Sequence, residues 1–204
     1  MKKTVKWQRL RYMPMIPLGE DGRRATASKA HIDLSREAAC EGMVLLKNEN
    51  NLLPLAAGTK LAVFGKAQAD YVKGGGGSGD VTVAYTRSLL DGLRIKESEG
   101  KVSLYAPLSD YYTDYVQAQY AAGQEPGRCP EAAVPVELLA EARAYADTAI
   151  ITLCRHSGEG SDRSGKPHDG DFYLSREEEA MVQAGESAFP HTIVVLNTGG
   201  MMDT

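Results

Sequence analysis

Four short runs of apolar residues recur along the chain, separated by stretches with helical periodicity. Each run ends at Gly or at polar residues, which is typical of a strand that is buried on both faces. Buried strands that alternate with helices indicate a parallel sheet covered by helices on both sides. The predicted strands are residues 60–65, 101–106, 148–154 and 192–199.

Helices are predicted where apolar positions are spaced three and four residues apart. Asp33 is suited to cap the first helix, and Asn48 is suited to end it. Ser175 stands three residues before Glu178, which is the spacing of a capping box at the start of the last helix. The predicted helices are residues 33–48, 86–95, 110–123, 135–147 and 175–189.

These elements predict an α/β fold, an open and mostly parallel sheet flanked by helices on both faces. This is an α/β sandwich of the flavodoxin-like kind. Residues 1–30 show no clean periodicity and are expected to form an irregular N-terminal arm, and residues 31–204 are expected to form the sandwich domain. The last predicted strand nearly reaches the end of the sequence, so we expect a sheet that is incomplete at its C-terminal strands.

The composition argues against some classes of partner and leaves the predicted fold unchanged. The chain has 204 residues, of which 43% are hydrophobic and 25% charged, and its net charge is −4. That charge argues against nucleic acid or an anionic membrane as a partner. No run reaches the roughly 18 apolar residues of a membrane helix, and no apolar region of signal-peptide length follows the basic N-terminus. We expect a cytoplasmic protein, and the sequence leaves a homo-oligomer open.

The cysteine and histidine patterns indicate neither a metal site nor a cofactor. Cys40, Cys129 and Cys154 are odd in number and widely spaced, and the sequence has no C-x-x-C pair. They are expected to be free, partly buried thiols. His156 and His168 lack the paired spacing of metal ligands and are interpreted as polar loop residues.

Candidate chemistry is concentrated in the loops after the first, third and fourth predicted strands. In open parallel sheets, ligands bind outside the carboxyl ends of the strands, so these loops should share one rim. The first loop contains GGGGSG at residues 74–79, but no Lys-Ser or Lys-Thr follows, so it is not a Walker phosphate loop and a nucleotide binder is disfavoured. A flexible linker and a backbone that approaches a ligand closely both remain open for this run.

The second loop, LCRHSGEGSDRSG at residues 153–165, holds Glu159 between two glycines. A solvated surface carboxylate is the commonest fate of a Glu and stays an alternative here. The position after a buried strand, with Arg155, His156 and Arg163 nearby, favours a functional carboxylate. As a proton donor, Glu159 would need its pKa raised by burial or by a neighbouring negative charge.

Four segments, in this order and at similar spacing, resemble glycoside hydrolase family 3, in which an α/β sandwich domain partners a TIM barrel. They are LSREAACEGMVLLKNENNLLPL, LAVFGKAQADYVKGGGGSGDV, CRHSGEGSDRSGKPHDGDFYLS and TIVVLNTGG, and together they extend the resemblance over residues 30–204. The resemblance implies a retaining β-glycosidase of carbohydrate metabolism that acts on a β-glucoside or β-xyloside, with β-glucosidase favoured. It implies Glu159 as the general acid/base. The residues it implies as pocket lining are Gly76, Gly77, Ser78, Arg155, His156, Ser157 and Arg163.

Two departures from the family pattern affect the expected activity. The TIM barrel, which carries the nucleophilic Asp, is absent from the chain, and the sandwich motifs stop at Thr204 where family domains continue. A retaining mechanism requires two carboxyl groups, so we expect the isolated chain to be inactive and to be part of a larger enzyme. The alternative is a non-catalytic sugar-binding or interaction module left after loss of the barrel, which an intact SGEG disfavours.

Overall fold

The computed structural model describes residues 28–74, 85–156 and 163–203. The chain divides into two compact units, residues 1–49 and 50–204, and each is described by itself. The sequence-based boundary after residue 30 stays a prediction.

Helix α2 (Lys29–Glu41), in the first unit, starts and ends earlier than the predicted helix over residues 33–48. The N-cap is Ser28, whose hydroxyl accepts a hydrogen bond from the backbone N–H of His31. Asp33 lies inside the helix and forms an ion pair with Lys29 one turn earlier. The expectation was wrong at both ends because the Ser28 hydroxyl caps the helix earlier and Gly42 ends it.

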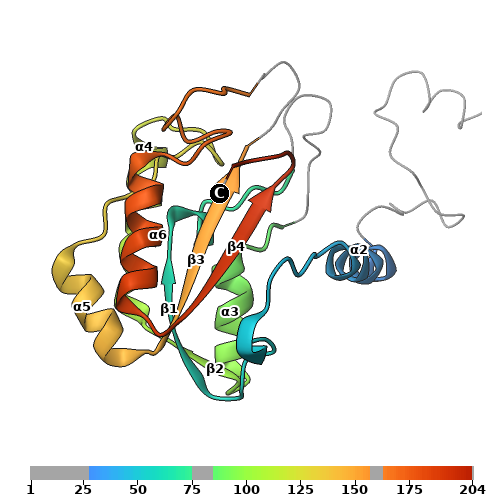
Figure 1. The fold of residues 1–204 in the computed structure, drawn as a ribbon. Helices are drawn as coiled ribbons and strands as arrows, with labels where there is room; N and C mark the ends of the chain where they lie inside the picture. The colour runs from blue at the N-terminus through green and yellow to red at the C-terminus, as the bar shows by residue number, and fades with distance from the viewer. Residues whose placement is uncertain (1–27, 75–84, 157–162, 204) are drawn as a thin grey trace, which may run out of the picture. The chain divides into compact units, whose positions relative to one another are not determined.

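A parallel sheet in the order β2-β1-β3-β4 forms the centre of the second unit (Figure 1). This confirms the predicted open, parallel sheet. Strand β3 is buried along its entire length, as its continuous apolar run predicts. The strands are β1 (Thr59–Phe64), β2 (Val102–Leu104), β3 (Thr148–Arg155) and β4 (His191–Thr198).

Helices cover both faces of this sheet, as predicted (Figure 1). Alternate residues of β1 point to opposite faces: Phe64 belongs to the core under α4, α5 and α6, and Val63 to the core under α3. Two short 3₁₀ turns are also described: η1 (Glu49–Asn51), which spans the end of the first unit and the start of the second, and η2 (Lys66–Gln68). The α-helices of the second unit are α3 (Leu89–Ser98), α4 (Ala106–Ala121), α5 (Val136–Tyr145) and α6 (Arg176–Ala188).

The capping box predicted for the last helix is present at the start of α6. The Ser175 hydroxyl accepts from the backbone N–H of Glu178 at 3.2 Å, and the Glu178 carboxylate accepts from the N–H of Ser175 at 2.9 Å. This cap fixes the side chain of Glu178 at the end of the helix that lies beside the carboxyl end of β3.

The turn after β1 requires a glycine. Gly65 has a φ of 96°, in the left-handed region, and a Cβ there would lie 2.3 Å from the carbonyl oxygen of Thr152 in β3. The Thr152 hydroxyl donates to the carbonyl of Phe64 at 2.8 Å. These contacts hold η2, which follows Gly65, directly above the end of β3.

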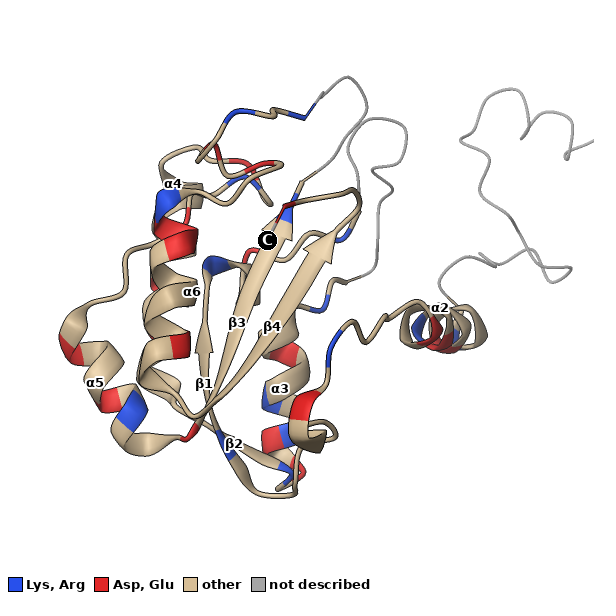
Figure 2. Ribbon diagram, in the orientation of Figure 1, with Lys and Arg blue, Asp and Glu red and all other residues tan. Residues whose placement is uncertain are grey.

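Charged residues lie mainly on the helices and near the strand ends, and the middles of the strands are uncharged (Figure 2). This distribution follows from the burial of the sheet on both faces. Among the described residues, no helix is both long and apolar enough to cross a membrane.

Candidate functional site

The loops that follow β1, β3 and β4 contact one another at the carboxyl edge of the sheet. The Asn197 amide, near the end of β4, donates to the carbonyl of Val72 in the first loop at 3.0 Å. The N–H of Asp203, after β4, donates to the carbonyl of Phe172 in the loop after β3 at 2.8 Å. The expectation that these loops share one rim is therefore confirmed for their described parts.

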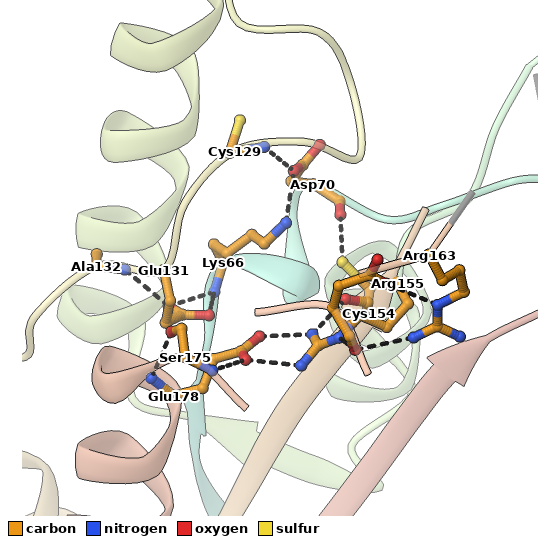
Figure 3. A network of polar contacts seen from close by, with 11 residues as sticks. Lys66, Asp70, Cys129, Glu131, Ala132, Cys154, Arg155, Arg163, Ser175 and Glu178 are labelled. Carbon is orange, nitrogen blue, oxygen red and sulfur yellow. Dashed lines mark hydrogen bonds and ion pairs between the residues drawn. The ribbon is translucent and has the colours of Figure 1, made fainter. Parts of the chain in front are cut away.

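Arg155 ends β3, and its guanidinium is almost completely buried at this rim, with 3% of the side chain exposed. It forms a bidentate ion pair with Glu178 of α6, in which Nη1 and Nη2 donate to the two carboxylate oxygens at 2.6 and 2.7 Å (Figure 3). Nη1 also donates to the carbonyl of Cys154, and Nε donates to the carbonyl of Asp171. The structure thus gives Arg155 an anchoring role that its sequence pattern did not indicate.

Arg163 approaches the same Asp171 from the other end of the loop. Its Nε donates to the Asp171 carboxylate at 2.6 Å, and its Nη2 donates to the Asp171 carbonyl at 2.8 Å. Its Nη1 is buried and has no hydrogen-bond partner among the described residues. Arg163 is therefore held in one orientation by the segment that leads into α6.

A cavity of about 570 Å³ opens beside these arginines. Its lining includes three residues that the sequence analysis implicated, Arg155, His156 and Arg163, together with Lys66 and Glu131. The other implicated residues lie outside the part of the chain that the structure describes, so their roles stay predictions. They are Glu159, Gly76, Gly77, Ser78 and Ser157.

A buried carboxylate, Asp70, joins the turn after β1 to the loop that follows α4. Asp70 is 0% exposed, and its side chain accepts four hydrogen bonds. The donors are the Lys66 ammonium at 3.1 Å, the Tyr120 hydroxyl at 2.6 Å, and the backbone N–H groups of Gly127 at 2.5 Å and Cys129 at 3.2 Å. Burial alone would raise the pKa of Asp70, but the Lys66 charge and the Tyr120 hydrogen bond lower it overall.

A second buried carboxylate, Glu131, fastens the same loop to the turn. It accepts from the backbone N–H of Lys66 at 3.0 and 3.2 Å and from its own neighbour, Ala132, at 3.0 Å (Figure 3). Burial raises the pKa of Glu131 to about 7, and these hydrogen bonds only partly offset the effect. The sequence analysis missed both carboxylates, because these partners are distant in the sequence. Tyr120 lies 50 residues from Asp70, and Lys66 lies 65 residues from Glu131.

Glu131→Gln is expected to make the chain more stable than the wild type at pH 8 and equally stable below pH 4.5. The native pKa is about 7 and the ordinary value is 4.5, so the native state binds this proton more tightly than the unfolded chain. The resulting stability is present below pH 4.5 and is lost as the pH rises to 7, by at most about 3 kcal/mol. Gln stays neutral and keeps one oxygen acceptor, which avoids the loss.

Urea unfolding followed by circular dichroism at pH 4, 5, 6, 7 and 8 measures this difference. The exposed Glu186 supplies the matched control, and Glu186→Gln should follow the wild type at every pH. Parallel pH profiles for Glu131→Gln and the wild type would show that Glu131 titrates normally.

Two thiols lie at the site, and that of Cys154 donates to the carbonyl of Asp70 at 3.5 Å. Cys129 and Cys154 are buried and free, and burial raises the pKa of the Cys129 thiol to about 11. Cys40, in the first unit, is exposed and free. In the described parts of the chain, no cluster of three or more His, Cys, Asp or Glu side chains is arranged to hold a metal ion.

Most of the chain is similar to known glycosyl hydrolases. The model of the glycosyl hydrolase family 3 C-terminal domain matches residues 43–204. Beta-glucosidase A of Butyrivibrio fibrisolvens is 49% identical over 219 residues, which cover 98% of this chain and 26% of that protein. A beta-glucosidase of Ruminococcus albus is 34% identical over 85% of this chain and 18% of its own length.

Solved structures show the same fold. Beta-glucosidase 3B from Thermotoga neapolitana, in complex with glucose, superposes with a TM-score of 0.78 at 31% identity, over 86% of this chain and 25% of that one. A beta-glucosidase from Paenibacillus barengoltzii gives a TM-score of 0.78 at 31% identity, over 87% of this chain and 19% of that one. The chain thus spans about a quarter, or less, of each of these relatives.

Proposed function

Because the chain belongs to glycosyl hydrolase family 3, as the C-terminal domain of that family, we propose that it supplies the general acid/base of a retaining β-glucosidase. Glu159 is the proposed residue. It would protonate the glycosidic oxygen as the aglycone departs and would later deprotonate the water that releases the sugar. The nucleophile would come from a TIM-barrel domain outside this chain.

The observation that carries this proposal is the anchoring of the loop that contains SGEG. Its described ends, Arg155 and Arg163, both bind Asp171 at the carboxyl edge of a parallel sheet, beside a cavity that both arginines line. This edge is where open α/β sheets bind ligands. The two carboxyl groups of a retaining glycosidase lie about 5–5.5 Å apart across the anomeric carbon. An acid on a rim loop can meet a nucleophile from a separate domain at that distance.

A β-glucoside is the favoured substrate, because several relatives are named as beta-glucosidases and one solved relative is in complex with glucose. The same names favour a catalytic domain over a sugar-binding module without activity. His156, with the glycine-rich segment around Gly76 and Gly77, is proposed to line the aglycone side of the pocket. A cytoplasmic location and a role in carbohydrate metabolism stay predictions from the sequence, and a homo-oligomer stays open.

The isolated 204-residue chain is expected to hydrolyse an aryl β-glucoside no faster than buffer does. With one carboxyl group of the required pair, it cannot form a glycosyl-enzyme intermediate. The comparison is with a complete enzyme, made by inserting this chain in place of the matched segment of the Butyrivibrio fibrisolvens relative. Release of the aryl alcohol, followed by absorbance, measures both.

The complete enzyme should turn over the substrate, and the chain alone should not. Substantial hydrolysis by the pure chain would contradict the proposal, because the nucleophile would then have to lie within these residues. A folded but inactive complete enzyme would favour the non-catalytic alternative, provided that the unmodified relative is active in the same assay.

A further inference from the structure

Asp171 receives hydrogen bonds from both sides of the segment that contains SGEG. We propose that Asp171 is a positioning residue, which sets the placement of the acid/base segment by holding Arg155 and Arg163 together. The inference rests on the proposed function of Glu159. Asp171 would act through the two ends of the segment, by its contacts with Arg155 and Arg163.

The outgoing end of the segment is held by the backbone of Asp171. Arg155 Nε donates to the Asp171 carbonyl oxygen at 2.6 Å, and the same guanidinium is fixed by its two bonds to Glu178. With 3% of its side chain exposed and its guanidinium held in place by these bonds, Arg155 has little freedom to turn. This end is therefore anchored to β3, α6 and Asp171 together.

The returning end is held by both the backbone and the side chain of Asp171. Arg163 donates to the same carbonyl oxygen at 2.8 Å and to one carboxylate oxygen at 2.6 Å, and the N–H of Ser164 donates to the other carboxylate oxygen at 2.5 Å. The Phe172 N–H donates to the Ser164 carbonyl at 3.2 Å and extends the pairing. Asp171 thus binds the chain both just before and just after the segment that contains SGEG.

Gly200, in the loop after β4, also packs against Arg163. A Cβ at Gly200 would lie 2.8 Å from Nη1 of Arg163, so the guanidinium packs directly against a backbone that has no side chain. Arg163 is therefore confined between Asp171 and Gly200. The confinement matters because Arg163 lies four residues after Glu159 in the sequence.

Fixing both ends of a short segment reduces the number of conformations that the residues between them can adopt. A proton donor works only when it is held close to its acceptor, and a misplacement of about 1 Å can cost about 100-fold in rate. Loss of the carboxylate bonds at the returning end, with the carbonyl bonds retained, should therefore cost about 10-fold. The loss should appear in kcat for substrates that need the acid and should leave KM nearly unchanged.

The test uses Asp171→Ala and the milder Asp171→Asn in the complete enzyme, each alone and combined with Glu159→Gln. Asp171→Ala should lower kcat on an alkyl β-glucoside about 10-fold in the wild-type background and less than about 2-fold in the Glu159→Gln background, because residues that act as a unit are not additive. Asp171→Asn keeps one acceptor and should fall between the wild type and Asp171→Ala. Asp114→Ala, an exposed change in α4 that lies outside the cavity lining, is the control and should leave kcat unchanged.

A second measurement keeps the inference testable if the complete enzyme with Asp171→Ala does not fold. In the 204-residue chain, hydrogen exchange of the peptide over residues 156–163 should be faster by a factor of about 3 to 10 in Asp171→Asn than in the control Asp114→Asn. Equal exchange in the two variants would overturn the inference. So would an equal loss of kcat from Asp171→Ala in both backgrounds, which would indicate a general structural defect. If Glu159→Gln alone has no effect on the alkyl glucoside, the proposed function fails instead.

Discussion

Glu159→Gln in the complete enzyme is expected to lower kcat/KM on an alkyl β-glucoside by about 10²- to 10⁴-fold, the usual contribution of a general acid. An alkoxide is a poor leaving group and must be protonated as the glycosidic bond breaks. An aryl β-glucoside with an acidic phenol leaves without that help. Its kcat/KM, which reports formation of the glycosyl-enzyme, should therefore fall far less.

The second half of the reaction gives a separate readout. Hydrolysis of the glycosyl-enzyme needs a base to deprotonate water, so kcat on the aryl glucoside should fall in the Glu159→Gln variant. Azide attacks without losing a proton, so adding azide should restore kcat and yield a glycosyl azide. The exposed Glu125, whose side chain is 77% exposed, is the matched control, and Glu125→Gln should behave as the wild type. Equal losses on alkyl and aryl substrates, with no azide rescue, would remove Glu159 from the acid/base role.

The fold could be predicted from the sequence because its main signal is local. Strand β3 follows a continuous apolar run over Thr148–Cys154 and is buried on both faces, which only a sheet covered by helices allows. The Ser175–Glu178 spacing likewise defines the start of α6, because both partners of the capping box lie within one helical turn. Patterns of this kind need no knowledge of distant contacts.

The start and end of α2 were mispredicted because the local signals there compete. Leu45 and Leu46 continue the apolar spacing of the helix beyond Gly42, yet the helix ends at that glycine and both leucines are exposed. A single residue of low helix propensity thus ends the helix although the apolar spacing continues. At the other end, both Ser and Asp are good N-cap residues, and Ser28 caps the helix before Asp33 is reached.

The anchoring contacts of the candidate site could not be predicted, because they join residues that are far apart in the sequence. The sequence analysis assigned no role to Asp70, whose carboxylate accepts from the backbone N–H groups of Gly127 and Cys129, 57 and 59 residues further along the chain. Glu178 was recognised as half of a capping box, but its bond to Arg155 spans 23 residues. A local pattern reports one role for each side chain, and Glu178 has two.

Glu178→Ala is expected to lower the free energy of unfolding of the chain by about 3–5 kcal/mol. Among the described residues, the change leaves the buried guanidinium of Arg155 with the carbonyl groups of Cys154 and Asp171 as its hydrogen-bond partners. It also removes the acceptor for the N–H of Ser175 in the capping box. Urea unfolding at pH 7, followed by circular dichroism, measures the loss, and Glu186→Ala, an exposed change in the same helix, should cost less than about 0.5 kcal/mol.

Replacing both partners separates the cost of an unpaired charge from the cost of lost packing. Arg155→Met combined with Glu178→Leu removes both charges and keeps apolar volume, and buried ion pairs replaced in this way often lose no stability. The double variant should therefore be more stable than Glu178→Ala by at least about 2 kcal/mol, although it still lacks the capping-box acceptor. If the double variant is no more stable than Glu178→Ala, the loss comes from the cap and from packing, and the buried Arg155 charge is solvated by other means. If the double variant is as stable as expected, removing both Arg155 and Glu178 lowers the free energy of unfolding little, and removing Glu178 alone lowers it much. In that case the pair contributes little net stability, and its effect is the geometry that it imposes on the rim, where Arg155 begins the segment that carries Glu159.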